Sequence, residues 1–379
     1  MQSWYGLKEA HKDFTIENDT DARLFFARHD LDEELKSMLR RSFRTETPPK
    51  LVLYGEWGVG KTHTMRHIEY VIAANDDFRA TVVFVELPDI IAKSSYQVAH
   101  AAFLDALGLE KAREWVVKYQ TNHSTDAREQ IQEFTQSGDV AAAFDNLITR
   151  GDGSRIAWDW LRGISLSATE ARLVGLPSTL AQSTLLVRVL QMFGRLSLEA
   201  DEKLLVFMLD EATKLQYVSN NDAVNHWINA FKALSDPLTK EVGFVVSGSW
   251  IDPDEMALPL QDQQVFTRFG EKNYIRLHNL NEDETRVFIK ALLSEWVDPE
   301  KREEISERYA AEAEGETVTG EAFPFTEGGI EVAVLYACRN AGVTTPRDIQ
   351  KALDDLFNRA IDEGRHILPS SYVNSLVSG

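Results

Sequence analysis

Eight consecutive residues, Gly55-Glu56-Trp57-Gly58-Val59-Gly60-Lys61-Thr62, have the types and spacing that phosphate binding requires. They follow the apolar run 51–54 and precede a segment whose helical periodicity begins near Lys61. Glycines let the backbone turn its N–H groups toward a phosphate, and the N-terminus of the next helix adds a favourable dipole. We therefore interpret the segment as a Walker A motif, in which Lys61 reaches the β and γ phosphates and the Thr62 hydroxyl binds Mg²⁺.

A second acidic element fits the same chemistry. The apolar run 204–209 ends in Asp210-Glu211, the pattern of a Walker B motif. We predict that Asp210 holds Mg²⁺ through water and that Glu211 orients and deprotonates the attacking water. Acidic residues also end strands at protein surfaces without any function, and it is the pairing with a Walker A motif that favours the catalytic interpretation.

The elements that position these motifs follow from the alternation of apolar runs and helical stretches. The pattern predicts an α/β fold with a parallel five-stranded sheet flanked by helices. The expected strands are residues 51–54, 81–87, 204–209, 242–246 and 274–277. We expect a helical preamble in 1–48, with helical periodicity over 20–44, a nucleotide-binding core in 49–280 and a helical lid domain in 281–379, whose last helix covers 346–363. A long helical insertion occupies about 88–202, where Trp158, Trp160 and Leu161 are expected to be buried rather than to form a docking surface.

Composition limits the partners. The net charge of −20 over 379 residues opposes non-specific binding to nucleic acid, so any DNA contact is expected to be local or indirect. Lys36, Arg40, Arg41 and Arg44 form a basic strip, which is typical of a solvated helix face. The single cysteine, Cys338, excludes an internal disulfide. Without an apolar run of membrane length or a secretory signal pattern, we expect a cytoplasmic protein that has no membrane partner.

From these motifs onward the sequence resembles the AAA+ superfamily of P-loop ATPases, in particular its replication-initiator-like branch. The resemblance implies ATP and Mg²⁺ as ligands and a homo-oligomer. It places sensor 1 after the fourth strand, with Ser249 the first choice and Ser247 the second. In Thr267-Arg268-Phe269-Gly270 it makes Arg268 the arginine finger, which acts on the ATP of a neighbouring subunit. In Thr344-Thr345-Pro346-Arg347-Asp348-Ile349 it makes Arg347 the sensor 2 arginine, which contacts the phosphates.

Two further comparisons refine that resemblance. Initiators of this branch usually carry a winged-helix DNA-binding domain after the lid, and from the few residues that follow Arg347 we expect none here. The segments 160–163 and 170–175, together with Gly60-Lys61-Thr62-His63, look like those of prokaryotic phage-defence ATPases, including BREX-type systems. That likeness implies a regulatory or motor ATPase in a multi-protein antiviral defence complex, and it adds His63 to the residues expected at the nucleotide.

Three functions remain open on sequence grounds. The first is an ATPase switch or motor that oligomerises on ATP and regulates partner proteins. The second is an ATP-dependent DNA-binding clamp or filament, like transposition-regulator ATPases, against which the acidic composition argues. The third is a non-hydrolysing scaffold stabilised by nucleotide, against which an intact Glu211 argues.

Overall fold

The computed structural model describes residues 1–9, 11, 15–17, 20–45, 47–123, 126–149, 151–180, 182–236, 240–339 and 341–378. The chain forms two compact units, each with its own apolar core. Unit 1 comprises Met1–Glu34, Glu56–His67 and Leu277–Gly379, and unit 2 comprises Leu35–Gly55 and Ile68–Arg276. The three-part domain division expected from the sequence stays a prediction.

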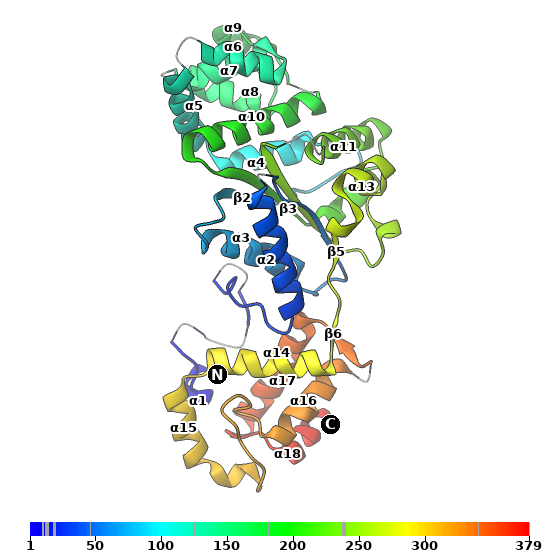
Figure 1. Ribbon diagram of the computed structural model, residues 1–379. Helices are drawn as coiled ribbons and strands as arrows, with labels where there is room; N and C mark the ends of the chain where they lie inside the picture. The colour runs from blue at the N-terminus through cyan, green and yellow to red at the C-terminus, as the bar shows by residue number, and fades with distance from the viewer. Residues whose placement is uncertain are drawn as a thin grey trace. The chain divides into compact units, whose positions relative to one another are not determined.

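Unit 2 is built on a parallel five-stranded sheet (Figure 1). Its strands are β1 (Lys50–Tyr54), β2 (Ala80–Glu86), β3 (Leu204–Asp210), β4 (Val242–Gly248) and β5 (Tyr274–Arg276), in the order β2-β3-β4-β1-β5. Every residue of β1, β3 and β4 is buried, because helices cover both faces of a parallel sheet. All five strands predicted from the sequence are confirmed, and so is the α/β fold class.

The register of the sheet decides which side chains meet at its carboxyl edge. Leu209 of β3 pairs with Val246 of β4, and Leu53 of β1 pairs with Ser247 of β4. The carboxyl ends of β1, β3 and β4 therefore lie side by side. Gly55, which follows β1, and Asp210, which ends β3, both lie at this edge.

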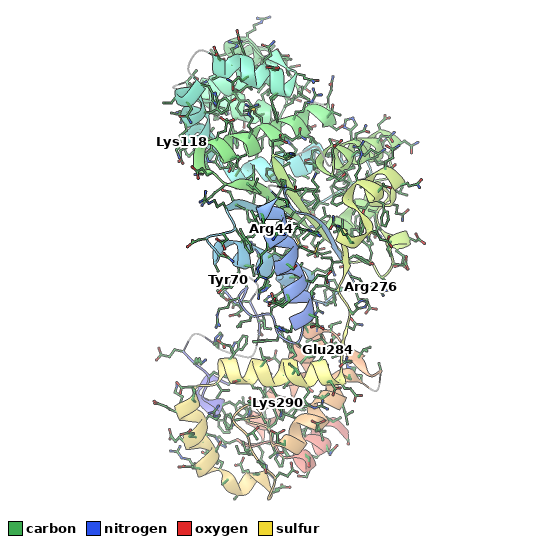
Figure 2. The ribbon with its side chains drawn as sticks, viewed as in Figure 1. Arg44, Tyr70, Lys118, Arg276, Glu284 and Lys290 are labelled. Carbon is green, nitrogen blue, oxygen red and sulfur yellow. The ribbon has the colours of Figure 1, made fainter. Side chains whose placement is uncertain are left out.

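Among the residues that the structure describes, the insertion between β2 and β3 contains seven α-helices. They are α4 (Gln97–Leu107), α5 (Leu109–His123), α6 (Ala127–Thr135), α7 (Gly138–Leu147), α8 (Asp152–Leu161), α9 (Ala168–Val174) and α10 (Ser183–Asp201). Trp158, Trp160 and Leu161 of α8 are buried in the core of unit 2, as predicted. Lys118 of α5, labelled in Figure 2, forms an ion pair with Asp201 of α10 at 2.8 Å.

The other helices of unit 2 that follow β3 pack on the sheet or connect its strands. Helix α11 (Asn221–Leu234) packs on β4, and α13 (Gln263–Phe269) packs against β1. The 3-10 helices η2 (Ala212–Tyr217), η3 (Pro253–Glu255) and η4 (Glu271–Asn273) and the short helix α12 (Leu258–Gln261) connect these elements.

Two helices have residues in both units, α2 (His29–Arg44) and α3 (Lys61–Ala73). The prediction of helical structure from residue 20 onward was wrong at its start. Ala27 has a left-handed backbone with φ 57°, which is incompatible with a right-handed helix that starts before this residue. The helix α2 begins after it, and Asp30 and Asp32 are the acidic residues of its first turn.

The C-terminal part of unit 1 is mainly helical. It contains α14 (Glu282–Trp296), α15 (Pro299–Arg308), η5 (Ala310–Ala313), α16 (Glu327–Cys338), α17 (Pro346–Asp362) and α18 (Ser370–Ser378). Lys290 of α14, which is labelled in Figure 2, donates to the Glu327 carboxylate of α16 at 2.7 Å. The prediction that α17 is the last helix was wrong, since α18 follows it and buries Val373 in the core of the unit.

Two smaller elements complete unit 1. The antiparallel pair β6 (Leu280–Asn281) and β7 (Val343–Thr344) interrupts the region expected to be wholly helical. The N-terminal helix α1 (Gln2–Tyr5) is held to the C-terminal part of unit 1 by Trp4. The indole N–H of Trp4 donates to the Arg365 carbonyl at 2.9 Å. Within the part of the chain that the structure describes, every helix is too short or too polar to cross a membrane.

Candidate functional site

The phosphate-loop segment connects the end of β1 at Tyr54 to the start of α3 at Lys61. Gly58 and Gly60 have positive φ angles of 84° and 95°, a conformation that glycine adopts without steric cost. Val59 is fully buried and anchors the loop. Lys61 is also buried, and its partly buried ammonium donates to the Glu56 carbonyl at 2.8 Å, so the side chain folds back over its own loop. This is the strand, glycine turn and helix arrangement that the motif requires.

The N-terminus of α17 packs directly on this loop within unit 1. A Cβ atom added at Gly58 would lie 3.1 Å from the Thr345 hydroxyl and 3.3 Å from Cβ of Arg347. The guanidinium carbon of Arg347 lies 3.7 Å from the ring centroid of Trp57. The structure thus brings the predicted sensor 2 arginine onto the predicted Walker A loop, although the two segments are far apart in the chain.

The start of α17 is fixed by its own capping residues. The Thr345 hydroxyl accepts from the Asp348 amide at 3.1 Å and donates to the Asp348 carboxylate at 2.8 Å, and Pro346 occupies the first helical turn. On the loop itself, the Asn279 side chain donates to the Glu56 carboxylate at 2.9 Å. Sequence reasoning missed Asn279, because nothing local to it signals a contact with the loop.

His63, on the first turn of α3, contacts the N-terminal segment of unit 1. Its Nε2 atom hydrogen-bonds with the Leu24 carbonyl, and burial lowers the pKa of the imidazole. One turn further on, His67 bonds with the Ala22 carbonyl at 2.8 Å and with the Asp32 carboxylate at 2.9 Å, and its ring stacks on Phe25. The residues before α2 therefore pack on α3. The nucleotide contact expected of His63 stays a prediction.

The acidic pair lies in unit 2, at the carboxyl edge of the sheet. Asp210 is buried, and its Oδ1 atom accepts both the Ser247 hydroxyl and the Glu211 amide, the latter at 2.9 Å. Glu211 leaves the strand in a left-handed conformation with φ 58° and ψ 31° and begins η2. These two hydrogen bonds hold the Asp210 carboxylate in a fixed orientation.

The structure distinguishes the two serines proposed for sensor 1. Strand β4 continues through Gly248, so Ser247 lies inside the sheet and contacts Asp210 of the neighbouring strand. Ser249 follows the strand, and its amide donates to the Thr213 hydroxyl at 2.6 Å. The sequence does carry a signal for Ser247, because a hydroxyl inside an apolar, buried strand requires a polar partner. The sensor role of Ser249 stays a prediction.

Arg268 is located near the end of α13 and is partnered within its own unit. It donates to the Lys232 carbonyl at 2.7 Å and lies 3.5 Å from the Asp236 carboxylate. Lys50 also contacts this residue, because its ammonium donates to the Asp236 carbonyl, and burial lowers the pKa of that lysine to about 8. A surface ion pair of this kind contributes little energy, so Arg268 can exchange partners at small cost.

The two side chains predicted to bind Mg²⁺ are of a chemical type that this ion accepts as a ligand. Among the described residues, no group of three or more His, Cys, Asp and Glu side chains could hold a metal by itself. Mg²⁺ is ordinarily bound by one or two protein oxygens together with phosphate oxygens and water. The Thr62 hydroxyl of unit 1 and the buried Asp210 carboxylate of unit 2 are each an oxygen donor of this type, and their joint binding of Mg²⁺ stays a prediction.

Comparison with known proteins gives structural likenesses only. No protein-family model and no curated protein matches the chain. The chain is similar to the ADP form of the Aeropyrum pernix ORC2 protein, with 13% identity, a TM-score of 0.49, and 97% of this chain and 72% of that chain covered. It is also similar to the Aeropyrum pernix ORC1 protein in complex with DNA, with 12% identity, a TM-score of 0.48, and coverage of 95% and 67%. For domain III of the Thermotoga maritima replication initiation protein DnaA, the identity is 11%, the TM-score 0.39 and the coverage 97% of both chains. Values at this level assign neither a family nor an activity.

Proposed function

We propose that the chain is an AAA+ ATPase that binds and hydrolyses ATP with Mg²⁺. The observation that carries the proposal is the presence of both nucleotide motifs. After β1, a loop with glycines in the positive-φ conformation leads to a buried Lys61. At the end of β3, the buried Asp210 accepts a hydrogen bond from the amide of Glu211, the next residue. Either motif alone occurs by chance more often than both do together in one parallel sheet.

The chain's own residues divide the chemistry among them. Lys61 leaves the Glu56 carbonyl and compensates charge on the β and γ phosphates, and backbone amides of residues 58–62 bind phosphate oxygens. When bound, Mg²⁺ supplies positive charge to the phosphates, and the Thr62 hydroxyl and Asp210 are the residues that hold it. Glu211 accepts a proton from water as the water oxygen attacks the γ-phosphorus, and ADP departs with the electrons of the broken P–O bond. The Ser247 hydroxyl keeps Asp210 oriented throughout.

The same proposal includes an oligomer whose geometry depends on ATP. Arg268 would exchange its Asp236 partner for the γ-phosphate of a neighbouring subunit, which couples hydrolysis to contact between subunits. ATP then acts as a switch, because it binds the assembled state more tightly than the separate subunits and thereby shifts the equilibrium toward assembly.

We further propose that this switch regulates partner proteins in a prokaryotic anti-phage defence complex. The support is the resemblance of segments 160–163 and 170–175 to phage-defence ATPases. A phage-challenge assay in cells that carry the complete complex tests this role. Equal plaque numbers with wild-type and Glu211→Gln protein would contradict it.

The biochemical core of the proposal is tested by ATP binding and turnover, with and without duplex DNA. Lys61→Ala should abolish ATP binding, and Glu211→Gln should bind ATP but hydrolyse it at least about a hundredfold more slowly. Glu202→Gln is a matched control, because Glu202 also has a left-handed backbone, with φ 55°, but is exposed at the end of α10. Absence of hydrolysis under every condition would refute the ATPase, and strong stimulation by DNA would favour the clamp instead.

A further inference from the structure

Trp57 is an unusual residue for the tip of a phosphate-binding loop, because its indole is large, apolar and exposed. Its relative exposure is 61%, so it does not contribute to the core. Two cations of α17 approach the ring instead: the Arg347 guanidinium at 3.7 Å and the Lys351 ammonium at 5.8 Å from its centroid. Exposed indoles attract cations through the negative face of the ring.

The distance indicates how Arg347 uses the ring. A separation of 3.7 Å is that of two planar groups in van der Waals contact, so the guanidinium is stacked on the indole. Stacking occupies the flat face of the guanidinium. Its N–H donors point outward in the plane of the group and can still bind phosphate oxygens in a bidentate manner. Trp57 and a phosphate therefore engage different parts of Arg347.

The loop is shaped to receive this arginine. Gly58 provides the space in which Cβ of Arg347 lies, since any side chain there would come within 3.3 Å of it. Arg347 and Lys351 are four residues apart on one helix, and like charges at this spacing repel each other. The Trp57 ring and the Asp348 carboxylate, 3.9 Å from the Lys351 ammonium, offset that repulsion.

We propose that Trp57 is a positioning residue, which holds the Arg347 side chain over the phosphate loop so that its N–H edge is already oriented when ATP binds. The inference rests on the proposed nucleotide site. Its energetic basis is preorganisation, because a free arginine loses rotamer entropy when it binds a phosphate, whereas a stacked one has already lost it. The aromatic ring itself makes no contact with the reacting atoms in this account.

A double-mutant cycle on nucleotide affinity tests the proposal. Trp57→Ala should weaken binding of a non-hydrolysable ATP analogue by about twofold to thirtyfold, the range of cation–π energies. Arg347→Ala should weaken it at least as much, and the double variant should bind like Arg347→Ala alone, because the ring acts only through the arginine. Trp57→Phe, which keeps an aromatic face, should recover part of the loss. Tyr217→Ala, which removes a ring of similar exposure, 68%, should bind like the wild type.

Failure of this inference is distinguishable from failure of the proposed function. If Lys61→Ala binds the analogue as well as the wild type does, the nucleotide site itself is wrong. If Lys61→Ala abolishes binding while the effects of Trp57→Ala and Arg347→Ala simply add, only the positioning role is wrong. Tighter binding by Trp57→Ala would also refute it, since the ring would then be competing with phosphate for the arginine.

Discussion

The burial of His100 predicts a loss of stability in acid that can be traced to one side chain. The imidazole, on α4 in the insertion, is fully buried. Its Nε2 atom donates to the Leu161 carbonyl at 2.7 Å, so Nδ1 is the nitrogen that must accept a proton on acidification. Nδ1 is buried without a hydrogen-bond partner among the described residues. Burial lowers the pKa of His100 from 6.5 to about 4, and the bond to Leu161 offsets only part of this effect.

The sign and the size of the effect follow from proton linkage. Between pH 6.5 and 4 the unfolded chain binds a proton at His100 that the folded chain excludes, so the folded state loses stability as the pH falls. The loss begins near pH 6.5, reaches about 2 kcal/mol at pH 5 and about 3 kcal/mol at pH 4. Out of a total stability of roughly 5–15 kcal/mol this is a large fraction.

The substitution His100→Gln separates this contribution from all other titrations. A glutamine amide can donate to the Leu161 carbonyl but does not ionise over this range. Urea unfolding of both proteins at pH 7.5, 6 and 5 should show the wild type losing about 2 kcal/mol more than the variant by pH 5. Parallel pH dependences of the two proteins would refute the reasoning. So would an NMR titration of His100 with a midpoint near the ordinary histidine value.

Three further variants test the site. Ser247→Ala removes a hydrogen bond to the charged Asp210 carboxylate worth about 1.5–3 kcal/mol, so ATP turnover should fall by roughly tenfold or more; an unchanged steady-state rate would contradict this role. Arg268→Ala should bind ATP normally yet lose at least about a hundredfold in turnover, and a wild-type rate would exclude a finger role. Gly58→Ala should weaken binding of an ATP analogue by about tenfold through steric conflict with α17, measured against Gly315→Ala, whose φ is also 84° but whose added Cβ meets nothing within 4 Å.

The parts of this molecule that could be predicted from its sequence are those whose signals are local. The β-strands are recognisable because burial on both faces makes them continuous apolar runs. The glycine-rich turn between β1 and α3 is recognisable because the Walker A pattern requires glycine, lysine and threonine at fixed spacing. The start of α17 at Pro346 is equally local, since Thr345 caps it.

The unpredicted contacts depend on register and on packing between distant segments. Whether Ser247 or Ser249 meets Asp210 depends on where β4 ends and how it aligns with β3, and the pairing of Leu209 with Val246 settles that alignment. The stacking of Arg347 on Trp57 joins segments far apart in the chain. No local pattern encodes either contact. Only the general rule that a buried hydroxyl needs a partner singles out Ser247 in advance.

Backbone strain by itself does not distinguish Glu211, the proposed catalytic base, from other glutamates of the chain. Glu211 has a left-handed φ of 58°, but Glu202 and Glu314 have φ angles of 55° and 54°. Those two residues terminate α10 and η5, where left-handed residues ordinarily end helical turns. Glu211 differs because it follows a buried strand and its amide donates to the Asp210 carboxylate. At this left-handed turn the Glu211 amide donates to the Asp210 carboxylate, and the chain leaves β3 for η2. The inference of a function for Glu211 therefore rests on its hydrogen bond with Asp210, and the left-handed φ angle is part of the geometry of that bonded pair.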